Sequence, residues 1–361
     1  MKPSNKRRRL AGIVAVAAVT AACTASPPVA SPPLPLPGGV RGVAVQSSSN
    51  AWAVGAPPAD VRPQKAIVAH WNGAAWTTLS PRGLPRLSAL GAVATFPGGA
   101  WAVGEHGLTQ HGDGGGRPKQ LIVRLTGTTM RRVPVAGLAD GGLVDVAATS
   151  AANAWAVGYL GGVGYFNPLI LHWNGTAWNR APLPAALGRG YFAGVAATSG
   201  ANAWAVMNTG RIVHWNGRRW GQVVSPAIGV SYRLNDMAAT SARNVWAVGS
   251  AGSTRTLILH WNGLRWTWAL SPKIHRGYSF RAFFAVSASS ADDALAVGSS
   301  GTGTLAVHWN GHGWKRFKTP RRGGFNSLED VTFIPRSGRA WAVDDTGSET
   351  LIFQWDGTAW H

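Results

Sequence analysis

The sequence NAWAVG at residues 50–55 decides the fold, because close copies of this hexad return along the whole chain. The further copies begin at residues 99, 153, 202, 244, 293 and 339, where they read GAWAVG, NAWAVG, NAWAVM, NVWAVG, DALAVG and RAWAVD. Their third positions lie 42 to 54 residues apart. A repeat of this length is typical of solenoids and β-propellers.

A second motif accompanies each hexad and predicts a β-hairpin. LHWNGTAW at residues 171–178 and LHWNGLRW at residues 259–266 place Asn-Gly between two apolar runs. Both central residues of a type I′ turn need positive φ, so Asn-Gly strongly indicates a two-residue hairpin. The same turn recurs at Asn72, Asn174, Asn216, Asn262, Asn310 and, as Asp-Gly, at Asp356. The second repeat lacks it and reads LTGTTM from Leu125.

The tryptophans explain why the hexad returns. Of the 19 tryptophans, 18 occupy repeat positions in the hexads or on either side of the hairpin turns, and only Trp268 does not. A single small sheet cannot cover its own faces, and a buried indole removes roughly 200 Å² from water. We therefore predict an all-β fold, a seven-bladed β-propeller with four strands in each blade, over residues 40–361. Exposed aromatic platforms for sugars are the alternative role of these tryptophans.

The repeat resembles a class of exported bacterial β-propellers that carry WAVG and HW(N/D)GxxW motifs, close in shape to the kelch and galactose-oxidase-like propellers. The resemblance covers residues 40–361 and implies the propeller fold, but no single activity. The kelch Gly-Gly doublets do not repeat in register, and the Ser-x-Asp-x-Gly-x-x-Trp box of sialidase-type propellers is absent. Copper-radical chemistry of the galactose-oxidase type needs a cysteine-linked tyrosine. The single cysteine lies far from the repeats, so we do not expect this chemistry.

The N-terminus has the pattern of an export signal. Five basic residues precede an uncharged run from Leu10 to Ala22, which is too short to span a bilayer. Cys23 follows in VTAAC, which resembles a bacterial lipobox, although Thr20 departs from the usual leucine. We predict a lipoprotein-type signal over residues 1–23, lipidated at Cys23, and a proline-rich linker over residues 24–39. An ordinary signal peptide with an incidental cysteine remains the alternative.

Charge and cysteine content limit the partners. The formal net charge is +20, and removal of the signal leaves +15. For an exported chain the available anions are wall polymers, lipid headgroups and acidic polysaccharides. Because arginines outnumber lysines 27 to 7, a GC-rich coding bias explains the charge equally well. We expect an exported monomer on the outer face of the cytoplasmic membrane, or secreted, with no nucleic acid partner, no disulfide and membrane contact through the lipid anchor only.

The two rims of the propeller should differ. The turn before each hexad and the Asn-Gly turn are short and alike, and we call the rim that they share the uniform rim. The loops after each hexad and between blades vary, and they share the variable rim, where binding groups are expected. The candidate ligand-binding residues on the variable rim combine aromatic rings with arginine donors: Tyr165, Phe166, Arg189, Tyr191, Tyr232, Arg233, Arg276 and Tyr278. Loop-packing tyrosines beside solvated arginines are the alternative.

Other polar clusters are weaker candidates. Glu105, His106, His111 and Asp113 share one loop, but their spacing matches no metal motif. Asp145, Asp236 and Asp330 occupy equivalent places on inner strands, where they could hold a cation or accept backbone hydrogen bonds. Five histidines precede the first hairpin tryptophan, and we interpret them as packing residues. We therefore predict no metal, no cofactor and no catalytic residue.

The leading functional hypothesis is a non-catalytic cell-surface binding propeller for a wall or extracellular glycan or an envelope protein. The first alternative is a polysaccharide hydrolase or lyase, for which Asp60, Glu105, Asp113, Asp344 and Asp345 are the carboxylates available on the variable rim. The second is an architectural scaffold. The last outer strand should be short, and the segment before Val40 is a candidate for closing the ring.

Overall fold

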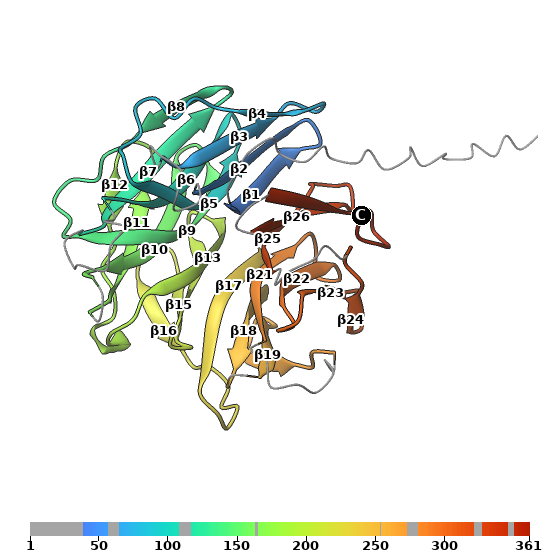
Figure 1. Ribbon diagram of the computed structural model, residues 1–361. Coiled ribbons are helices and arrows are strands. Elements are labelled where there is room, and N and C mark those ends of the chain that lie inside the picture. Colours follow the sequence, from blue (N-terminus) through green and yellow to red (C-terminus); the bar gives the residue numbers. More distant parts are fainter. Residues whose placement is uncertain are drawn as a thin grey trace, which may run out of the picture.

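The protein is an all-β ring of seven sheets around one axis, as Figure 1 shows. The computed structural model describes residues 39–56, 65–107, 117–162, 165–252, 254–272, 281–320, 327–345 and 350–361. Within these residues a single short 3₁₀ helix, η1 (Ala185–Leu187), accompanies 27 strands. The predicted signal, Cys23 and the linker up to residue 38 lie outside the described residues.

Each blade takes its strands in chain order, from the axis outward. The strands of the first three blades are β1 (Gly39–Ser47), β2 (Asn50–Ala56), β3 (Ile67–Trp71), β4 (Trp76–Thr78), β5 (Ser88–Phe96), β6 (Gly99–His106), β7 (Lys119–Thr126), β8 (Thr129–Arg132), β9 (Gly141–Ser150), β10 (Asn153–Leu160), β11 (Asn167–Trp173) and β12 (Trp178–Arg180). The strands of the next two are β13 (Phe192–Ser199), β14 (Asn202–Met207), β15 (Ile212–Trp215), β16 (Trp220–Val223), β17 (Tyr232–Ser241), β18 (Asn244–Ala251), β19 (Arg255–Trp261) and β20 (Trp266–Ala269). The last two contain β21 (Ala282–Ala288), β22 (Ala294–Ser299), β23 (Thr304–Trp309), β24 (Trp314–Phe317), β25 (Leu328–Phe333), β26 (Ala340–Asp345) and β27 (Thr350–Trp355).

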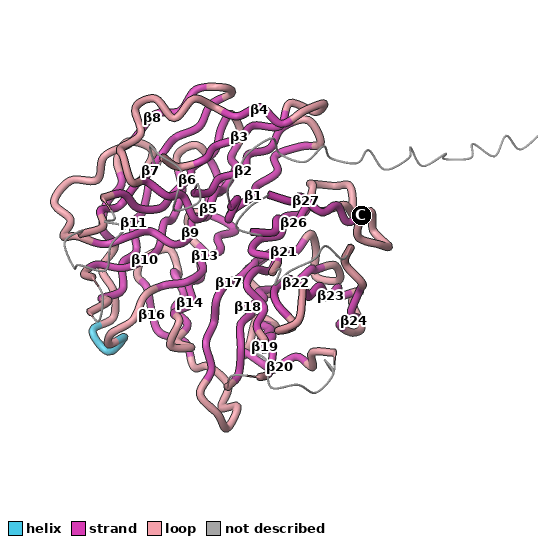
Figure 2. Tube along the Cα trace, in the orientation of Figure 1, coloured by secondary structure: helices cyan, strands magenta, loops and turns pink. Residues whose placement is uncertain are grey.

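This arrangement confirms the predicted seven-bladed propeller. Six sheets have four antiparallel strands, and the seventh has three. The outer edge of the seventh sheet is completed by a bridge between Trp355 and Trp360 and by reciprocal backbone hydrogen bonds between Gln354 and His361, at 3.0 and 2.8 Å. The seventh outer strand is therefore short, as the sequence predicts. Figure 2 shows that loops, rather than helices, make almost all of the connections.

The hexad forms the second strand of every blade, where both faces are covered. In β2 the residues from Ala51 to Gly55 are all buried. The glycine that ends most hexads is required by a close approach: a Cβ at Gly55 would lie 2.0 Å from the carbonyl oxygen of Gly39 on the inner strand. Gly104, Gly158, Gly249 and Gly298 face the same contact at 2.0 to 2.2 Å. At these five positions a side chain would push the first two strands of the blade apart.

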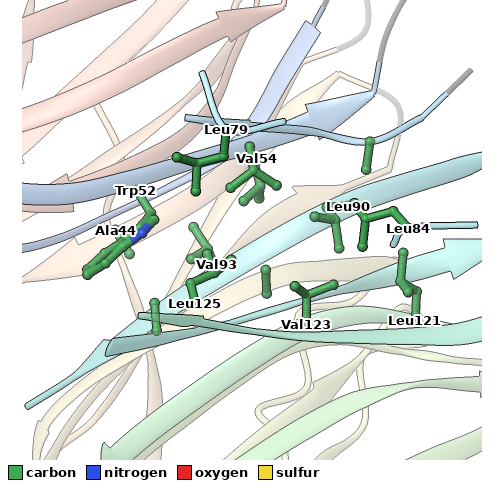
Figure 3. Packing of buried hydrophobic residues seen from close by; sticks show 14 residues of the cluster. Ala44, Trp52, Val54, Leu79, Leu84, Leu90, Val93, Leu121, Val123 and Leu125 are labelled. Carbon is green, nitrogen blue, oxygen red and sulfur yellow. The ribbon is translucent and has the colours of Figure 1, made fainter. Parts of the chain in front are cut away.

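The tryptophans fill the wedges between blades, as the repeat predicts. The indole of one hexad packs against the two hairpin indoles of the next blade, so that Trp204 meets Trp261 and Trp266 at centroid distances of 5.0 and 5.6 Å. Trp101, Trp155 and Trp246 make the equivalent contacts in their own wedges. The first wedge is different, because Leu125 stands where a hairpin tryptophan would lie beside Trp52 (Figure 3).

The same packing closes the ring. Trp341 of the last blade lies 5.6 Å from Trp71 and 5.4 Å from Trp76 of the first blade, measured between ring centroids. Val43 N–H on β1 donates to Asp330 Oδ2 on β25 at 2.8 Å. Blade 7 therefore meets blade 1 through the same kinds of contact that join the other blades. Of the segment before Val40, which the sequence suggested for closing the ring, only Gly39 belongs to the described residues.

A polar network on the uniform rim explains the asparagine of the hexad and the histidine of the hairpin. His214 Nε2–H donates to Asn202 Oδ1 at 2.7 Å, and Asn202 Nδ2 donates to Thr198 Oγ1 at 2.7 Å. The imidazole stacks on the Trp204 indole with a centroid distance of 4.1 Å. Burial lowers the pKa of His214, as it does for His70, His172 and His260. These histidines are neutral packing residues, as the sequence predicts.

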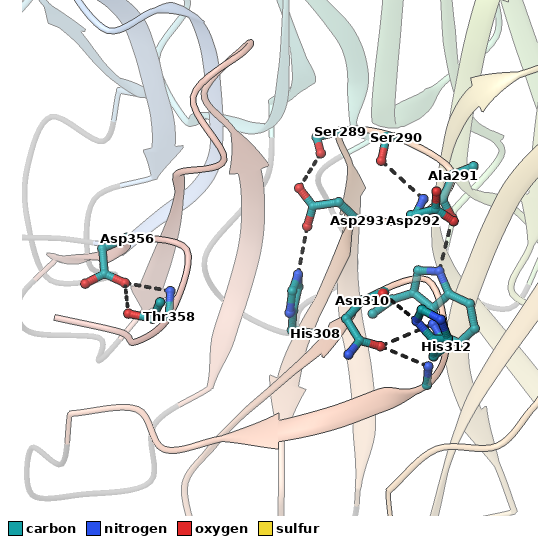
Figure 4. Close-up of polar contacts among 12 residues, drawn as sticks. Ser289, Ser290, Ala291, Asp292, Asp293, His308, Asn310, His312, Asp356 and Thr358 are labelled. Atoms are coloured by element: carbon teal, nitrogen blue, oxygen red, sulfur yellow. Dashed lines mark hydrogen bonds and ion pairs between the residues drawn. The ribbon is translucent and has the colours of Figure 1, made fainter. Parts of the chain in front are cut away.

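Blade 6 carries a charged version of this network. Asp293 replaces the asparagine and accepts a hydrogen bond from His308 Nε2 at 2.7 Å (Figure 4). Asn310 in the same blade accepts two backbone N–H bonds with its Oδ1, which holds the hairpin turn. In blade 2 Arg124 takes the place of the histidine, and its Cζ lies 5.5 Å from the Trp101 ring.

The described residues include no helix with the length and apolar character needed to cross a bilayer.

Candidate functional site

The variable rim of blades 3 to 5 brings together most of the aromatic candidates. Tyr159 lies near the end of β10, Tyr165 and Phe166 lie between β10 and β11, and Tyr191 directly precedes β13. Tyr232 is the first residue of β17. Tyr278 and Arg276 lie outside the described residues.

Three of these rings form a packed cluster. Tyr159 contacts Phe166 at a centroid distance of 4.7 Å and Tyr191 at 6.4 Å, and Phe166 lies 5.8 Å from Tyr191, all edge to face. Tyr159 O–H donates to Glu105 Oε2 at 2.7 Å, which ties blade 3 to blade 2. Burial, reinforced by this hydrogen bond, raises the pKa of Tyr159 above its ordinary value. The three rings pack mainly against one another, and this packing holds the loop between β10 and β11 in place.

Tyr165 and Arg189 stand apart from this packing. The Tyr165 side chain is 64% exposed, and the guanidinium carbon of Arg189 lies 5.0 Å from its ring centroid. The loops that carry them are joined, because Gly190 N–H donates to Phe166 O at 2.9 Å. A guanidinium over an aromatic ring is a cation–π pair, and Arg189 is itself exposed.

A second arginine, which the sequence analysis does not single out, lies beside this pair. Arg211 Nη1 lies 3.5 Å from the place that a Cβ would occupy on Gly188, the residue before Arg189. Gly188 has φ of +64° and follows η1, so the backbone turns tightly there. The Arg211 side chain, from the turn between β14 and β15, therefore lies against the loop that carries Arg189. An arginine at the start of β15 gives no motif, and only its contact with Gly188 reveals it.

Tyr232 is packed against its neighbours, whereas Arg233 is exposed. The Tyr232 ring lies under Gly210, where a Cβ would come within 2.7 Å of Cε2, and its hydroxyl donates to Gly210 O at 3.3 Å. Arg233 is exposed at the start of the same strand. Of the candidate tyrosines that the structure describes, Tyr165 alone offers an exposed ring face.

The central channel holds the three inner-strand aspartates. It encloses about 290 Å³ and is lined by Asp145, Asp236 and Asp330, with valines and alanines between them. Each carboxylate joins its blade to the next: Asp145 Oδ2 accepts from Val195 N–H at 2.7 Å, and Asp236 Oδ2 accepts from Val286 N–H at 2.8 Å. Asp330 makes the equivalent bond to Val43. These hydrogen bonds confirm the backbone-capping interpretation of the three aspartates.

Burial dominates the titration of these carboxyls. It raises the pKa of Asp145 and Asp330 to about 7, against the opposing effect of the backbone N–H donors. The pKa of Asp236 is raised well above its ordinary value by burial and by the charge of Asp145. Among the described residues, no group of three His, Cys, Asp or Glu side chains lies close enough together to hold a metal ion.

The inner strands of blades 4 and 5 approach each other closely at Gly194. A Cβ on Gly194 would lie 2.7 Å from Cα of Asp236 in the next blade, whereas nothing lies within 4 Å of the same position on Gly221. Gly194→Ala should therefore lower the free energy of unfolding by about 1–3 kcal/mol, because blades 4 and 5 must separate. Gly221→Ala is the control, with a change below about 0.5 kcal/mol. Urea unfolding of both variants checks this, and equal midpoints would contradict it.

The other polar candidates do not converge in the described structure. Glu105 is engaged by Tyr159, and His106 Nε2 accepts from Arg132 Nη2 at 2.9 Å, so the two neighbours point to different partners. His111, Asp113 and Asp60 lie outside the described residues. Asp344 is completely buried on β26, and Asp345 ends that strand. The carboxylates described in side-chain detail, Glu105 and Asp344, come from blades 2 and 7, with blade 1 between them.

Comparison with known proteins supports the fold alone. No protein-family model matches the chain, and no curated protein matches it in sequence. A structure described as YCF48 bound to D1 peptide is similar with a TM-score of 0.60 and 14% identity, over 90% of this chain and 93% of that one. A catalytically inactive virginiamycin B lyase from Staphylococcus aureus with quinupristin gives 0.61 and 11%, over 88% and 96%.

A third similar structure is described as a xyloglucanase. The GH74 xyloglucanase from Xanthomonas campestris is similar with a TM-score of 0.60 and 16% identity, over 88% of this chain and 52% of that chain. The chain has the architecture that these proteins share. At such low identity the likeness extends to the propeller and not to its ligands.

Proposed function

We propose that the protein is a non-catalytic binding propeller, which takes a glycan or a protein partner on the variable rim of blades 3 to 5. The observation that carries this proposal is the pair formed by exposed Tyr165 and Arg189, with Arg211 beside it. A rigid ring of seven sheets holds these loops in place, so little conformational entropy is lost when a ligand binds. An aromatic face with guanidinium donors suits the apolar face and hydroxyl or acidic groups of a sugar, or an acidic peptide.

The neighbours in fold are compatible with such a role. One is described with a bound peptide, one with quinupristin, and one as a xyloglucanase. We further propose that the chain is exported and held at the outer face of the membrane through Cys23, and that it belongs with exported WAVG-repeat propellers. The hexads, the hairpins and the N-terminal pattern support this placement.

Replacing Tyr165 and Arg189 together by alanine should weaken binding to purified cell-wall material at least tenfold, as for the loss of a central aromatic and arginine anchor. Both side chains are exposed, so the melting temperature should stay unchanged. Isothermal titration with soluble wall fragments, or with an envelope protein fraction, measures the effect. Arg131→Ala, on the exposed edge of blade 2, is the matched control.

Undiminished binding by the double variant would remove this rim as the ligand site. Tyr191 and Tyr232 are unsuitable for the test because they pack against neighbouring residues, and their loss would disturb the loops.

A further inference from the structure

The charge of the chain is unevenly distributed around the ring. Residues 146–291, which run from blade 3 to the start of blade 6, contain twelve arginines and lysines but one acidic residue, Asp236. That carboxylate lies in the channel and is bonded to Val286 N–H. The outer surface of blades 4 and 5 therefore presents cations without intervening carboxylates.

Exposed apolar side chains gather in the same sector. Among the described residues, the exposed large hydrophobic side chains are Tyr165, Val224, Val230, Leu264, Trp268 and Leu270. Three of them lie on or beside the outer strand of blade 5, where Leu264 and Leu270 are 86% exposed and Trp268 is 42% exposed. Trp268 is also the tryptophan that stands outside the repeat, so wedge packing does not account for it.

Arginines surround this apolar strip, and we call the six residues together the blade 5 edge patch: Leu264, Trp268, Leu270, Arg243, Arg255 and Arg265. The Arg255 guanidinium carbon lies 5.9 Å from the Trp268 ring. The stem of Arg243 lies over Gly263, where a Cβ would come within 2.8 Å of its Cγ. None of the three arginines pairs with a carboxylate of the described residues.

The local backbone holds the patch in place. Leu264 N–H and Arg265 N–H both donate to Asn262 Oδ1, at 3.0 and 3.1 Å, so the turn that presents them is fixed. The neighbouring blade 4 also exposes Arg218 and Arg219 in its hairpin turn and Val224 after its outer strand. Strands β16 and β20 lie on the same side of the ring in Figure 2. On the other side the patch ends at blade 6, where Asp292 occupies the place of Arg243.

We propose that the blade 5 edge patch is a docking face for an anionic lipid membrane. Guanidinium groups pair with lipid phosphates, while Trp and Leu side chains lie in the interface between headgroups and acyl chains. The patch lies along the outside of the ring, away from the central channel, which suits a planar surface more than a small ligand. This contact is separate from the Tyr165 and Arg189 site, and it adds to any anchoring through Cys23.

The test uses the chain from residue 24 onward, so that neither the apolar run before Cys23 nor an acyl chain contributes. Binding to vesicles of 30% phosphatidylglycerol in phosphatidylcholine is measured by co-sedimentation, against vesicles of phosphatidylcholine alone. The double substitution Arg243→Gln, Arg265→Gln should weaken binding to the anionic vesicles about thirtyfold. The reason is that each arginine near an anionic membrane surface contributes a similar binding free energy, and the two contributions add. Trp268→Ser with Leu270→Ser should weaken it about tenfold.

The control removes the same charge from exposed positions of blades 1 and 2, with Arg82→Gln and Arg131→Gln. This control variant should retain most of the binding. With the patch intact, hydrogen exchange should show that residues 264–270 become protected when the chain binds anionic vesicles. An equal loss in the control would assign the binding to net charge and overturn the proposal. No preference for the anionic vesicles, or occupation of the patch by an acidic protein while vesicles leave it unprotected, would also overturn it. Wall binding by the Tyr165 site is measured separately, so the two proposals fail independently.

Discussion

Replacing Trp204 by alanine should lower the free energy of unfolding by about 3–5 kcal/mol, the cost of removing a large aromatic side chain from a packed core. Its indole is 1% exposed and fills the wedge between blades 4 and 5, against Trp261 and Trp266. The change also removes the ring on which His214 stacks. Because neighbouring blades share every wedge, the loss at one wedge weakens the whole ring. Urea unfolding followed by far-UV circular dichroism measures the effect.

Trp268→Ala is the matched control, since it removes the same side chain from an exposed position. We expect a change below about 1 kcal/mol there, from the loss of its contact with Arg255. Trp204→Leu should be milder than Trp204→Ala, because blade 6 already has a buried leucine, Leu295, at the equivalent position. Equal destabilisation by Trp204→Ala and Trp268→Ala would show that the wedges do not depend on their indoles.

The channel carboxyls should make the ring less stable as the pH rises from about 4 to about 7. Their folded pKa values, about 7 for Asp145 and Asp330, lie above the value of 3.8 expected in the unfolded chain. Between these two values the folded protein binds more protons than the unfolded chain, so the stabilisation is complete below the unfolded pKa and is lost as the pH rises through the folded pKa. We expect a change on the order of 3 kcal/mol for each of these two carboxyls over this range, because one pKa unit corresponds to about 1.4 kcal/mol.

The buried histidines change the stability with pH in the opposite direction. The contribution of the carboxyls must therefore be measured as a difference between two proteins. The pKa values of His70, His172, His214 and His260 are lowered by burial, and their contribution is lost as the pH falls below the ordinary value of 6.5. The stability of the wild type relative to the Asp145→Asn, Asp330→Asn variant isolates the carboxyls. This difference should decrease from pH 4.5 to pH 7.5, and parallel pH profiles of the two proteins would contradict the assignment.

The repeat made most of the fold predictable. Hexad spacing, Asn-Gly turns and tryptophan positions are local patterns that translate into strands, hairpins and wedges. The turn itself is not the two-residue type I′ turn that Asn-Gly predicts, because four residues separate the paired Trp215 and Trp220 and only the glycine among them has positive φ. The structure confirms seven sheets and the packed histidines, and it adds the reasons for two letters of the hexad. The asparagine bonds to the hairpin histidine, and the glycine accommodates the first strand of the same blade. Neither partner can be named from the hexad alone, because each lies on another strand.

The candidate site was less predictable. The sequence placed tyrosines and arginines on one rim, but it could not separate the exposed ring of Tyr165 from the packed rings of Tyr191 and Tyr232. Arg211 carries no motif, and it joins Arg189 only because the backbone turns at Gly188. The blade 5 edge patch likewise combines residues from two turns, from two strands and from the loop after β20. Exposure and these contacts depend on how loops from different blades meet.

By itself, the sequence determined the number of blades, the strands within each one and the residues that fill the wedges, because these follow from periodic patterns within a single repeat. Only the tertiary structure decided which rim residues face solvent, how blade 7 meets blade 1, and that three aspartates distant in sequence share one channel. The physical reason is that a repeat encodes contacts with its immediate neighbours. Burial, electrostatic coupling and surface exposure are set by the closed ring as a whole.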